Sequence, residues 1–417
     1  MSEIYLHPGL RTPFVKAGKE YAQHSSLDLS VPIVQAMSAA ARPDLLVWGQ
    51  VIPDPALSNI ARELAFEAGL DPAVPAYSTV MACSTSMMAT LQAAGMLGRS
   101  GMHLALVGGA ESMSHTPVAL KYRVAERLLA ELTRHPASAA DVFAALRLRD
   151  FDLPSKGWAN RVSGRTMGDH MEDTAKELNI SRAEQDRHAL LSHQRATAAQ
   201  DAGFFRDLIV PFADVEHDTL PRRDTSSEKL AKLPPAFDTT SGDGTLTAGN
   251  SSPLTDGAAG IWVADQEGLG RLGVAPAVKL VDWQVEALDF RTEGMLMAPA
   301  RAIPRLLARH ELQAEEIALW EIHEAFAAQV IANIKAASDR GYRREKARVD
   351  FDTGAVPVDR VNPHGGSVAL GHPFAATGAR ILSQAVKELT AMGRGARAIV
   401  SVCADGGQGT VALLERV

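Results

Sequence analysis

Cysteine is scarce in this 417-residue sequence, which contains only Cys83 and Cys403. The two lie far apart and have no other cysteine or histidine at zinc-finger spacing, which argues against a disulfide framework and a structural zinc site. A chain of this length can bury enough apolar surface to fold without such crosslinks. If the two cysteines matter, they therefore matter as thiols.

Long hydrophobic runs are also missing. Apolar stretches such as residues 103–110 and 257–264 fall well short of the roughly 20 residues that a membrane-spanning helix needs. The first residues lack the apolar core and cleavage site of an export signal, and the Arg- and Ser-rich character of a transit peptide. We therefore expect a cytoplasmic protein, in a reducing compartment that keeps both thiols free.

The net charge of −7 gives the chain no overall basic footprint for nucleic acid. Apolar residues make up 46% of the sequence and charged residues 22%, the balance of a globular protein, and the length suggests two or three domains. We expect no nucleic-acid partner and no bound metal.

Short runs of β-branched and apolar residues alternate with longer Ala-rich stretches of helical character. This alternation predicts an α/β fold with a mostly parallel sheet and helical crossovers. The clearest strand candidates are Leu45–Val51, Leu104–Val107, Ile317–Ile322 and Ala398–Val402. The clearest helix candidates, Ser84–Leu97 and Ala375–Leu389, carry small side chains that let a helix pack closely against a sheet.

A faint internal repeat links the two ends of the chain. An offset of 294 positions places Leu104 on Ala398, and an offset of 272 places residues 43–49 beside residues 315–321. Chance similarity between two strand–turn units would explain either match alone. Because the two cysteines occupy corresponding neighbourhoods, we interpret the repeat as two similar α/β halves.

Residues 121–241 are interrupted by several prolines, and we predict that they form an insertion on the surface of the first half. Within it, Met171–Ala202 predicts two helices, the second with Ser181 as N-cap and Glu184 as its capping-box partner. Residues 121–165 contain nine Lys or Arg against five Asp or Glu, although the whole chain is acidic. This basic segment is either a solvated helical face or a surface for a phosphorylated ligand, an anionic membrane or a partner chain.

Cys83 lies where an extended run gives way to a small-residue helix. A thiol at a helix N-terminus feels the positive end of the helix dipole and nearby free N–H groups, which favour the thiolate. The alternative is a small buried residue kept for packing, which is the commoner role of an isolated cysteine. The immediate neighbourhood does not decide between a nucleophile and a core residue.

A glycine-rich stretch, Asn362–Arg380, favours the nucleophile. Its glycines predict backbone close to a ligand or in left-handed conformations. His372 lies between glycine and proline directly before a helix candidate, a position that suits proton transfer with a thiol. His364, in contrast, is predicted to be a structural or solvent-facing loop residue.

Two further reactive side chains follow strand candidates. Cys403 ends a predicted buried strand and precedes a glycine-rich turn, where ligands bind in open α/β sheets, so its thiol could act as an acid or base. His323 follows the strand candidate at Ile317–Ile322, where a histidine is more often structural than catalytic.

Together these motifs resemble those of the thiolase family over essentially the whole chain. The matching stretches are Arg11–Phe14, the segment around Cys83, Gly108–Ser114, Leu230–Phe237, Thr247–Ser252, His323–Phe326, Gly371–Pro373 and the turn after Cys403. The resemblance implies two βαβαβαββ-type halves in a five-layered αβαβα arrangement with an inserted loop domain. We place the first half at residues 1–120 and 242–275, the loop domain at 121–241 and the second half at 276–417.

The resemblance also implies a reaction, the thiolytic cleavage of a 3-ketoacyl-CoA by CoA to acetyl-CoA and a shortened acyl-CoA. Cys83, deprotonated by His372, would attack the keto carbon and become acylated. Cys403 would protonate the departing acetyl-CoA enolate. Coenzyme A is then a substrate, and no tightly bound cofactor is expected.

Thiolases stabilise oxyanions at two sites. By resemblance, His372 and a water held by His323 form one, and the backbone N–H groups of Cys83 and Asp405 form the other. Losing one such donor typically costs about 2.7–4 kcal/mol of barrier stabilisation. Asp405 departs from the alanine of the similar subgroup, and its carboxylate would disfavour an oxyanion unless it points away or is paired, for example with an arginine.

The motif that begins at His323 carries histidine where most thiolases carry asparagine. This form resembles the β-subunit of the trifunctional fatty-acid oxidation complex and its bacterial relatives. The subgroup implies degradative cleavage of medium or long acyl chains. It also implies a homodimer, a dimer of dimers or an α2β2 complex with a hydratase/dehydrogenase chain.

Coenzyme A contacts are assigned by resemblance. Ser252 should face the pantetheine arm, and Arg222, Arg223 and Ser226 are candidates for the adenine and phosphate end. A bidentate arginine suits phosphate, although the two arginines could equally be solvated.

Three other functions fit parts of the pattern. One is a biosynthetic acetoacetyl-CoA thiolase running the reverse Claisen condensation. A second is a ketosynthase using Cys83, His323 and His372, against which Cys403 supplies the second acid/base of a reversible cleavage. The third is a non-catalytic lipid carrier on the same fold, which would be expected to lose at least one of the reactive residues.

Overall fold

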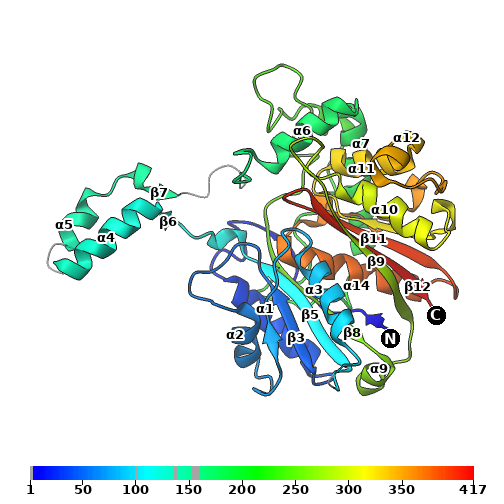
Figure 1. Ribbon diagram of the computed structural model, residues 1–417, viewed down its shortest axis with the longest axis horizontal. Coiled ribbons are helices and arrows are strands. Elements are labelled where there is room, and N and C mark those ends of the chain that lie inside the picture. Colours follow the sequence, from blue (N-terminus) through cyan, green and yellow to red (C-terminus); the bar gives the residue numbers. More distant parts are fainter. Residues whose placement is uncertain (1–2, 100, 136–138, 153–158) are drawn as a thin grey trace.

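The computed structural model describes residues 3–99, 101–135, 139–152 and 159–417 (Figure 1). Its main strands are β1 (Tyr5–His7), β2 (Val15–Lys16), β3 (Leu45–Gly49), β4 (Ala76–Tyr77), β5 (Leu104–Glu111), β8 (Thr255–Ala264), β9 (Val278–Ala287), β10 (Leu319–Ile322), β11 (Arg397–Ala404) and β12 (Gln408–Arg416). They form one sheet in the order β10-β11-β12-β9-β1-β8-β5-β3-β4, with β2 paired to β8. Two very short strands, β6 (Ala119–Leu120) and β7 (Phe151–Asp152), pair separately.

The sheet is mixed, so the prediction of a mostly parallel sheet is wrong. Strand β3 runs parallel to β4 and β5, and β10 runs parallel to β11. All pairings from β5 through β8, β1, β9 and β12 to β11 are antiparallel. Many of these strands are buried on both faces, and a doubly buried strand gives a continuous apolar run whichever way its neighbours point.

Helices cover the sheet in layers. They are α1 (Ser26–Ser38), α2 (Ile60–Glu67), α3 (Thr85–Met96), α6 (Met167–Glu177), α7 (Arg182–Asp201), α8 (Ser227–Ala231), α9 (Gln266–Leu272), α10 (Ala298–Arg309), α11 (Ala327–Ser338), α12 (Arg340–Tyr342), α13 (Ser367–Leu370) and α14 (Thr377–Thr390). The capping box of Ser181 and Glu184 at the start of α7 is confirmed. No helix in the described part of the chain is long and apolar enough to cross a membrane.

Alternating side chains connect each strand to two different cores. In β3, Leu45 and Val47 join the core that contains α3 and α14, whereas Leu46 and Trp48 join the core under α1 and α2. In β11, Val400 joins the first of these cores, and Ile399 joins a third core under α10 and α11. This period of two places α3 and α14 in a central helical layer between the strands of the two halves, which confirms the layered thiolase-type α/β fold.

The internal repeat has a structural counterpart. Strands β3 and β5 pair in parallel in the first half, with Leu45 opposite Ala105, and β10 and β11 pair in parallel in the second, with Leu319 opposite Ala398. A central helix precedes the inner strand of each pair, α3 before β5 and α14 before β11. The segment before α3, which carries Cys83, therefore corresponds to the segment before α14, which carries His372. Cys403 lies instead at the end of β11, so the expectation that the two cysteines occupy corresponding neighbourhoods is wrong.

The first part of the predicted insertion extends away from the body of the molecule (Figure 1). It carries α4 (Tyr122–Arg134), α5 (Ala139–Ala145) and the β6–β7 pair, and the basic residues 121–165 fall mainly here. Parts of that basic segment, residues 136–138 and 153–158, lie outside the described residues. Below we call residues 119–152 the arm.

Candidate active site

The chain turns sharply just before Cys83. Ala82 has a positive φ of 45°, which is uncommon for a residue with a side chain. Backbone hydrogen bonds from Ser84 to Met81 (3.0 Å) and from Thr85 to Ala82 (3.1 Å) hold the turn. Helix α3 begins at Thr85, so Cys83 lies directly before a helix N-terminus, as the sequence predicted.

The contact between α3 and α14 brings the two halves together at this point. The Ala379 N–H donates to the Ser86 hydroxyl at 2.8 Å. A Cβ at Gly378 would lie 2.4 Å from the Met87 backbone nitrogen, so glycine is required for this approach. The turn before α14 carries His372, which is thereby placed beside the turn that carries Cys83.

The structure brings together Cys83, His323 and His372. The Cys83 sulfur and one nitrogen of each ring lie within 4.8 Å of one another. The two imidazole rings have centroids 4.1 Å apart and are tilted by 47°. In the described part of the chain, the Nε2 atoms of both histidines are buried without a hydrogen-bond partner, so both are available to a substrate.

A thiol and two imidazoles also form a donor set that zinc accepts. However, the Arg380 guanidinium lies behind His323, where it donates to Ser367 at 2.9 Å. A positive charge in this place opposes the binding of a divalent cation. The arrangement therefore fits proton transfer better than metal ligation.

Burial keeps all three groups neutral in the free protein. It lowers the pKa of His372 to about 3, and it lowers the pKa of His323 well below its usual value. Burial, with the nearby Asp405 and Glu111 carboxylates, raises the pKa of the Cys83 thiol to about 12. The expectation that the helix N-terminus would favour a resting thiolate is therefore wrong, because desolvation outweighs the helix.

The backbone amides of Cys83 and Asp405 both favour a negative charge on the Cys83 sulfur. These are the two N–H groups that the sequence suggested as an oxyanion site. The Asp405 side chain is paired not with an arginine but with Asn160, whose Nδ2 donates to Oδ1 at 2.8 Å. Its carboxylate is thus held by a residue of the stretch that the sequence predicts to be an insertion.

Cys403 ends β11 and is 1% exposed. Gly406 and Gly407 have φ of 84° and 75°, and this turn returns the chain into β12. Burial and, next, the Cys83 sulfur raise the pKa of the Cys403 thiol well above its usual value. The two cysteines are therefore close enough to interact electrostatically, although they come from opposite halves of the chain.

A cavity of about 1000 Å³ opens beside these groups. Cys83, His372, Asp405 and Ser252 line it, whereas His323 and Cys403 do not. Its apolar lining includes Met167, Phe237, Leu254, Leu296, Phe326 and Phe374. A cavity of this size and character is typical of a site for a large, partly apolar ligand.

Three of the predicted coenzyme contacts do not line this cavity. Arg223 is exposed and forms a bidentate pair with Asp201. Ser226 caps α8, and the Arg222 amide donates to His193 at 3.2 Å. Their roles stay predictions.

The sequence did not predict a role for Glu324, a buried acid that links α7 to the loop between Asn362 and Val368. Glu324 bonds to His188, Ser192, Asn362 and the Val368 amide. Against its burial, the bonds from His188, Asn362 and Ser192 lower its pKa to about 2. His364 bonds to the buried Glu388 and stacks on Phe204 with centroids 3.7 Å apart, in agreement with a structural role. In the sequence, the glutamate directly after His323 is the feature that could have predicted this network.

A half-buried thiol, two neutral imidazoles, a second and buried thiol and two backbone amides lie together beside one cavity. This set is typical of a class of protein, the α/β acyltransferases that use a cysteine nucleophile. The family models "Thiolase, N-terminal domain" and "Thiolase, C-terminal domain" match residues 5–267 and 274–416. The chain belongs to the thiolase family, and it is an enzyme of the acyltransferase type.

Known relatives match along the whole chain. A 3-ketoacyl-CoA thiolase of Yersinia enterocolitica is 36% identical, and one of Erwinia tasmaniensis is 37% identical, each covering 99% of this chain and 96% of the relative. Among solved structures, the Acat5 thiolase of Ascaris suum in complex with coenzyme A has a TM-score of 0.81 at 26% identity and full coverage of both chains. The acetyl-CoA acetyltransferase of Bacillus anthracis has a TM-score of 0.80 at 29% identity, covering 100% of this chain and 99% of that one.

Proposed function

We propose that the protein cleaves 3-ketoacyl-CoA with CoA, giving acetyl-CoA and an acyl-CoA two carbons shorter, in fatty-acid β-oxidation. The observation that carries the proposal is the meeting of Cys83, His323 and His372 within 4.8 Å, at a cavity of about 1000 Å³. Relatives named 3-ketoacyl-CoA thiolase at 36–37% identity support this direction over the biosynthetic condensation.

The first half-reaction begins with a neutral thiol and a neutral imidazole. His372 accepts the Cys83 proton as the sulfur attacks the keto carbon, which forms a tetrahedral alkoxide. The bond between the second and third acyl carbons then breaks. The acyl group stays on Cys83, and the acetyl-CoA enolate takes a proton from Cys403.

The second half-reaction restores the enzyme. The thiol of an incoming CoA gives its proton to the Cys403 thiolate and attacks the acyl-cysteine carbonyl. The new tetrahedral intermediate collapses to acyl-CoA, and the Cys83 sulfur recovers its proton from His372. Each residue thus ends in its starting state.

Charge develops on an oxygen in both halves. We assign the oxygen on the carbon that bonds to Cys83, first the keto oxygen and then the acyl-cysteine carbonyl, to the amides of Cys83 and Asp405. We assign the thioester oxygen of the acetyl-CoA enolate to His372 and a water held by His323. The unpartnered Nε2 atoms of the two histidines and the two amides aimed at the sulfur support these assignments.

The apolar wall of the cavity is proposed to hold the acyl chain. Met167 and Phe237 come from the inserted domain, and Leu254 and Phe326 come from the two halves. Ser252 lines the same cavity and is placed on the pantetheine side. Arg222, Arg223 and Ser226 are exposed or half-buried at the surface, where they can receive the phosphate end of coenzyme A.

We further propose that the basic segment, residues 121–165, binds an anionic membrane surface through the arm. Its side chains Tyr122, Leu129, Phe143 and Leu148 are 54–81% exposed. Residues 121–165 have four more basic than acidic side chains. Exposed apolar groups on a basic helical segment suit the boundary of anionic lipid. Flotation with phosphatidylglycerol vesicles tests this; co-purification with a hydratase/dehydrogenase chain in an α2β2 complex would instead assign the arm to a partner.

We also propose that the protein forms a homodimer or a dimer of dimers and that it is cytoplasmic. The two cysteines are free thiols in the structure, as a reducing compartment would keep them. Light scattering of the purified protein gives the oligomeric state directly, and a monomer would contradict the proposed assembly.

The activity itself is tested by a series of 3-ketoacyl-CoA substrates from four to sixteen carbons, each with and without CoA. Acetyl-CoA and the shortened acyl-CoA should appear in equal amounts, and only when CoA is present. Absence of turnover at every chain length would refute the proposed function and favour a lipid carrier.

A further inference from the structure

The two active-site histidines are each held by a hydroxyl group on the side away from the substrate. His323 Nδ1 lies 2.9 Å from Ser367 Oγ, and His372 Nδ1 lies 2.6 Å from Thr377 Oγ1. All four residues are buried. Because a hydroxyl can either donate to an imidazole nitrogen or accept from it, its other partner decides which tautomer the ring adopts.

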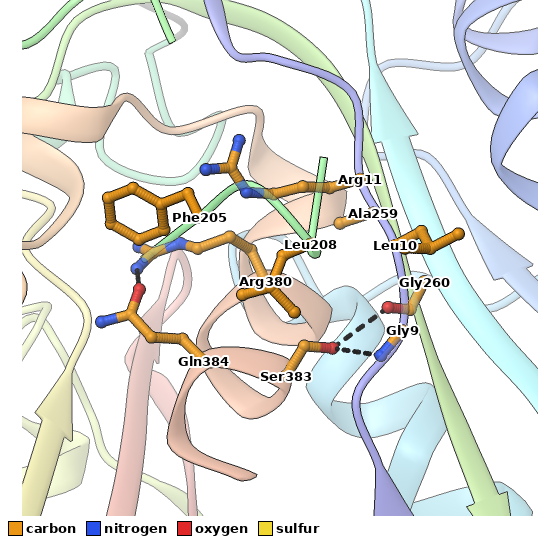
Figure 2. Close-up of a pocket in the computed structure, with 10 residues that line it drawn as sticks. All are labelled: Gly9, Leu10, Arg11, Phe205, Leu208, Ala259, Gly260, Arg380, Ser383 and Gln384. Carbon is orange, nitrogen blue, oxygen red and sulfur yellow. Dashed lines mark hydrogen bonds between the residues drawn. The ribbon is translucent and has the colours of Figure 1, made fainter. Parts of the chain in front are cut away.

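The second partner of Ser367 is a donor. Arg380 Nη2 donates to Ser367 Oγ at 2.9 Å, and the hydroxyl has no further partner among the described residues. Figure 2 shows the Arg380 guanidinium, whose Nη1 also donates to Gln384 at 3.2 Å. With one lone pair taken by a cation, the serine proton points to the remaining partner, His323 Nδ1. The ring proton of His323 must then be on Nε2.

The second partner of Thr377 is an acceptor. Its hydroxyl donates to the Pro373 carbonyl at 3.4 Å, which leaves Oγ1 to accept from His372 Nδ1. The ring proton of His372 is then on Nδ1, and its Nε2 carries a lone pair. Thus one ring presents an N–H to the site and the other presents a base, although both are neutral imidazoles.

We propose that Ser367, with Arg380 behind it, is a positioning residue that holds His323 as the Nε2–H tautomer, opposite to the tautomer that Thr377 imposes on His372. The different roles of the two histidines rest on the proposed function. His372 Nε2 takes the Cys83 proton, and His323 Nε2–H donates to the water or oxyanion. The structure thereby makes a base and a hydrogen-bond donor from two identical side chains.

The tautomers can be read without substrate. Protein labelled with ¹⁵N in its histidine rings is examined by NMR, and His323→Gln and His372→Gln variants assign the two rings. We expect a protonated Nε2 for His323 and a protonated Nδ1 for His372. A wild-type His323 with its proton on Nδ1 would overturn the proposal.

Enzyme kinetics test whether the position and tautomer of His323 affect turnover. Ser367→Ala should lower kcat about ten- to a hundredfold, the usual loss for a residue that orients a functional histidine, while KM for 3-ketoacyl-CoA changes much less. Ser367→Thr, which keeps the hydroxyl, should recover most of the activity. Arg380→Lys should weaken the preference for Nε2–H in the NMR spectrum.

Ser383→Ala is the matched control. Ser383 lies in the same helix as Arg380, but its hydroxyl bonds to Gly9 and Gly260 at a small cavity of about 10 Å³ (Figure 2). It should leave both tautomers and kcat unchanged. A Ser367→Ala variant with wild-type kcat would overturn the positioning role. A wild type that shows the expected tautomers but no thiolysis would refute the proposed function alone.

Discussion

The imidazole rings of His323 and His372 lie with their centroids 4.1 Å apart, and both residues are buried. One follows β10 and the other precedes α14, so the contact joins two loops of the second half. Burial keeps both rings neutral, and the positive charge of Arg380 further disfavours a proton on either of them. The site is therefore built for proton transfer between neutral groups.

This neutrality predicts acid sensitivity. Burial lowers the pKa of His372 from 6.5 to about 3. Between these values the unfolded chain binds the proton and the folded chain does not, so stability falls as pH falls. From pH 6.5 to pH 4, wild type should lose about 3 kcal/mol more unfolding free energy than His372→Asn. Urea unfolding at the two pH values measures this difference, and equal losses in both proteins would contradict it.

Asp405 is predicted to suppress the reactivity of the resting nucleophile. After burial, its charge is the next cause that raises the pKa of Cys83 to about 12. Asp405→Asn removes the charge but can still accept from Asn160, so alkylation of Cys83 by iodoacetamide at pH 8 should be about three to ten times faster. Asp173→Asn removes an exposed acid of the inserted domain as the control. An unchanged alkylation rate in Asp405→Asn would show that the Asp405 charge does not raise the pKa of the Cys83 thiol.

The variant Cys403→Ala tests whether the two thiols have different roles. Because a positioned acid or base typically contributes 10²–10⁴-fold, we expect kcat to fall by at least about a hundredfold. Cys83 should still be alkylated, since its turn and the α3–α14 contact are intact. Full activity in Cys403→Ala would remove it from the mechanism, and the melting temperature checks that the variant is folded.

Gly378 tests the contact that aligns the halves. Its substitution by alanine would place a Cβ 2.4 Å from the Met87 backbone nitrogen. We expect a loss of about 1–3 kcal/mol in stability and a lower kcat, because α3 and α14 must move apart. Gly95→Ala, in α3 with no atom within 4 Å of the new Cβ, should be neutral or stabilising by up to about 1 kcal/mol. Equal melting temperatures for the two variants would contradict this account.

Local patterns in the sequence predicted much of this architecture. The strands beginning at Leu45 and Leu104, the helix after Cys83 and the cap at Ser181 follow from short-range periodicity and capping. Periodicity does not encode strand direction, and for this reason the mixed sheet was missed. The meeting of Cys83 with His372 came from motif resemblance, and the structure supplies its physical cause in the close approach at Gly378.

Other features depend on contacts between distant segments. The pairing of Asn160 with Asp405 joins the inserted domain to the turn after β11. The bond of Ser367 to His323 joins two loops of the second half. The high pKa of the Cys83 thiol reflects burial, which a helix-terminus argument leaves out. No local pattern carries this information, because each effect arises only when the chain is packed.

The central claim is that Cys83 carries the acyl group. The protein is mixed with a 3-ketoacyl-CoA in the absence of CoA, quenched in acid, digested and analysed by mass spectrometry. We predict the shortened acyl group on the peptide containing Cys83, its disappearance when CoA is added before the quench, and no adduct in Cys83→Ala. An acyl group found only on Cys403 would contradict the account.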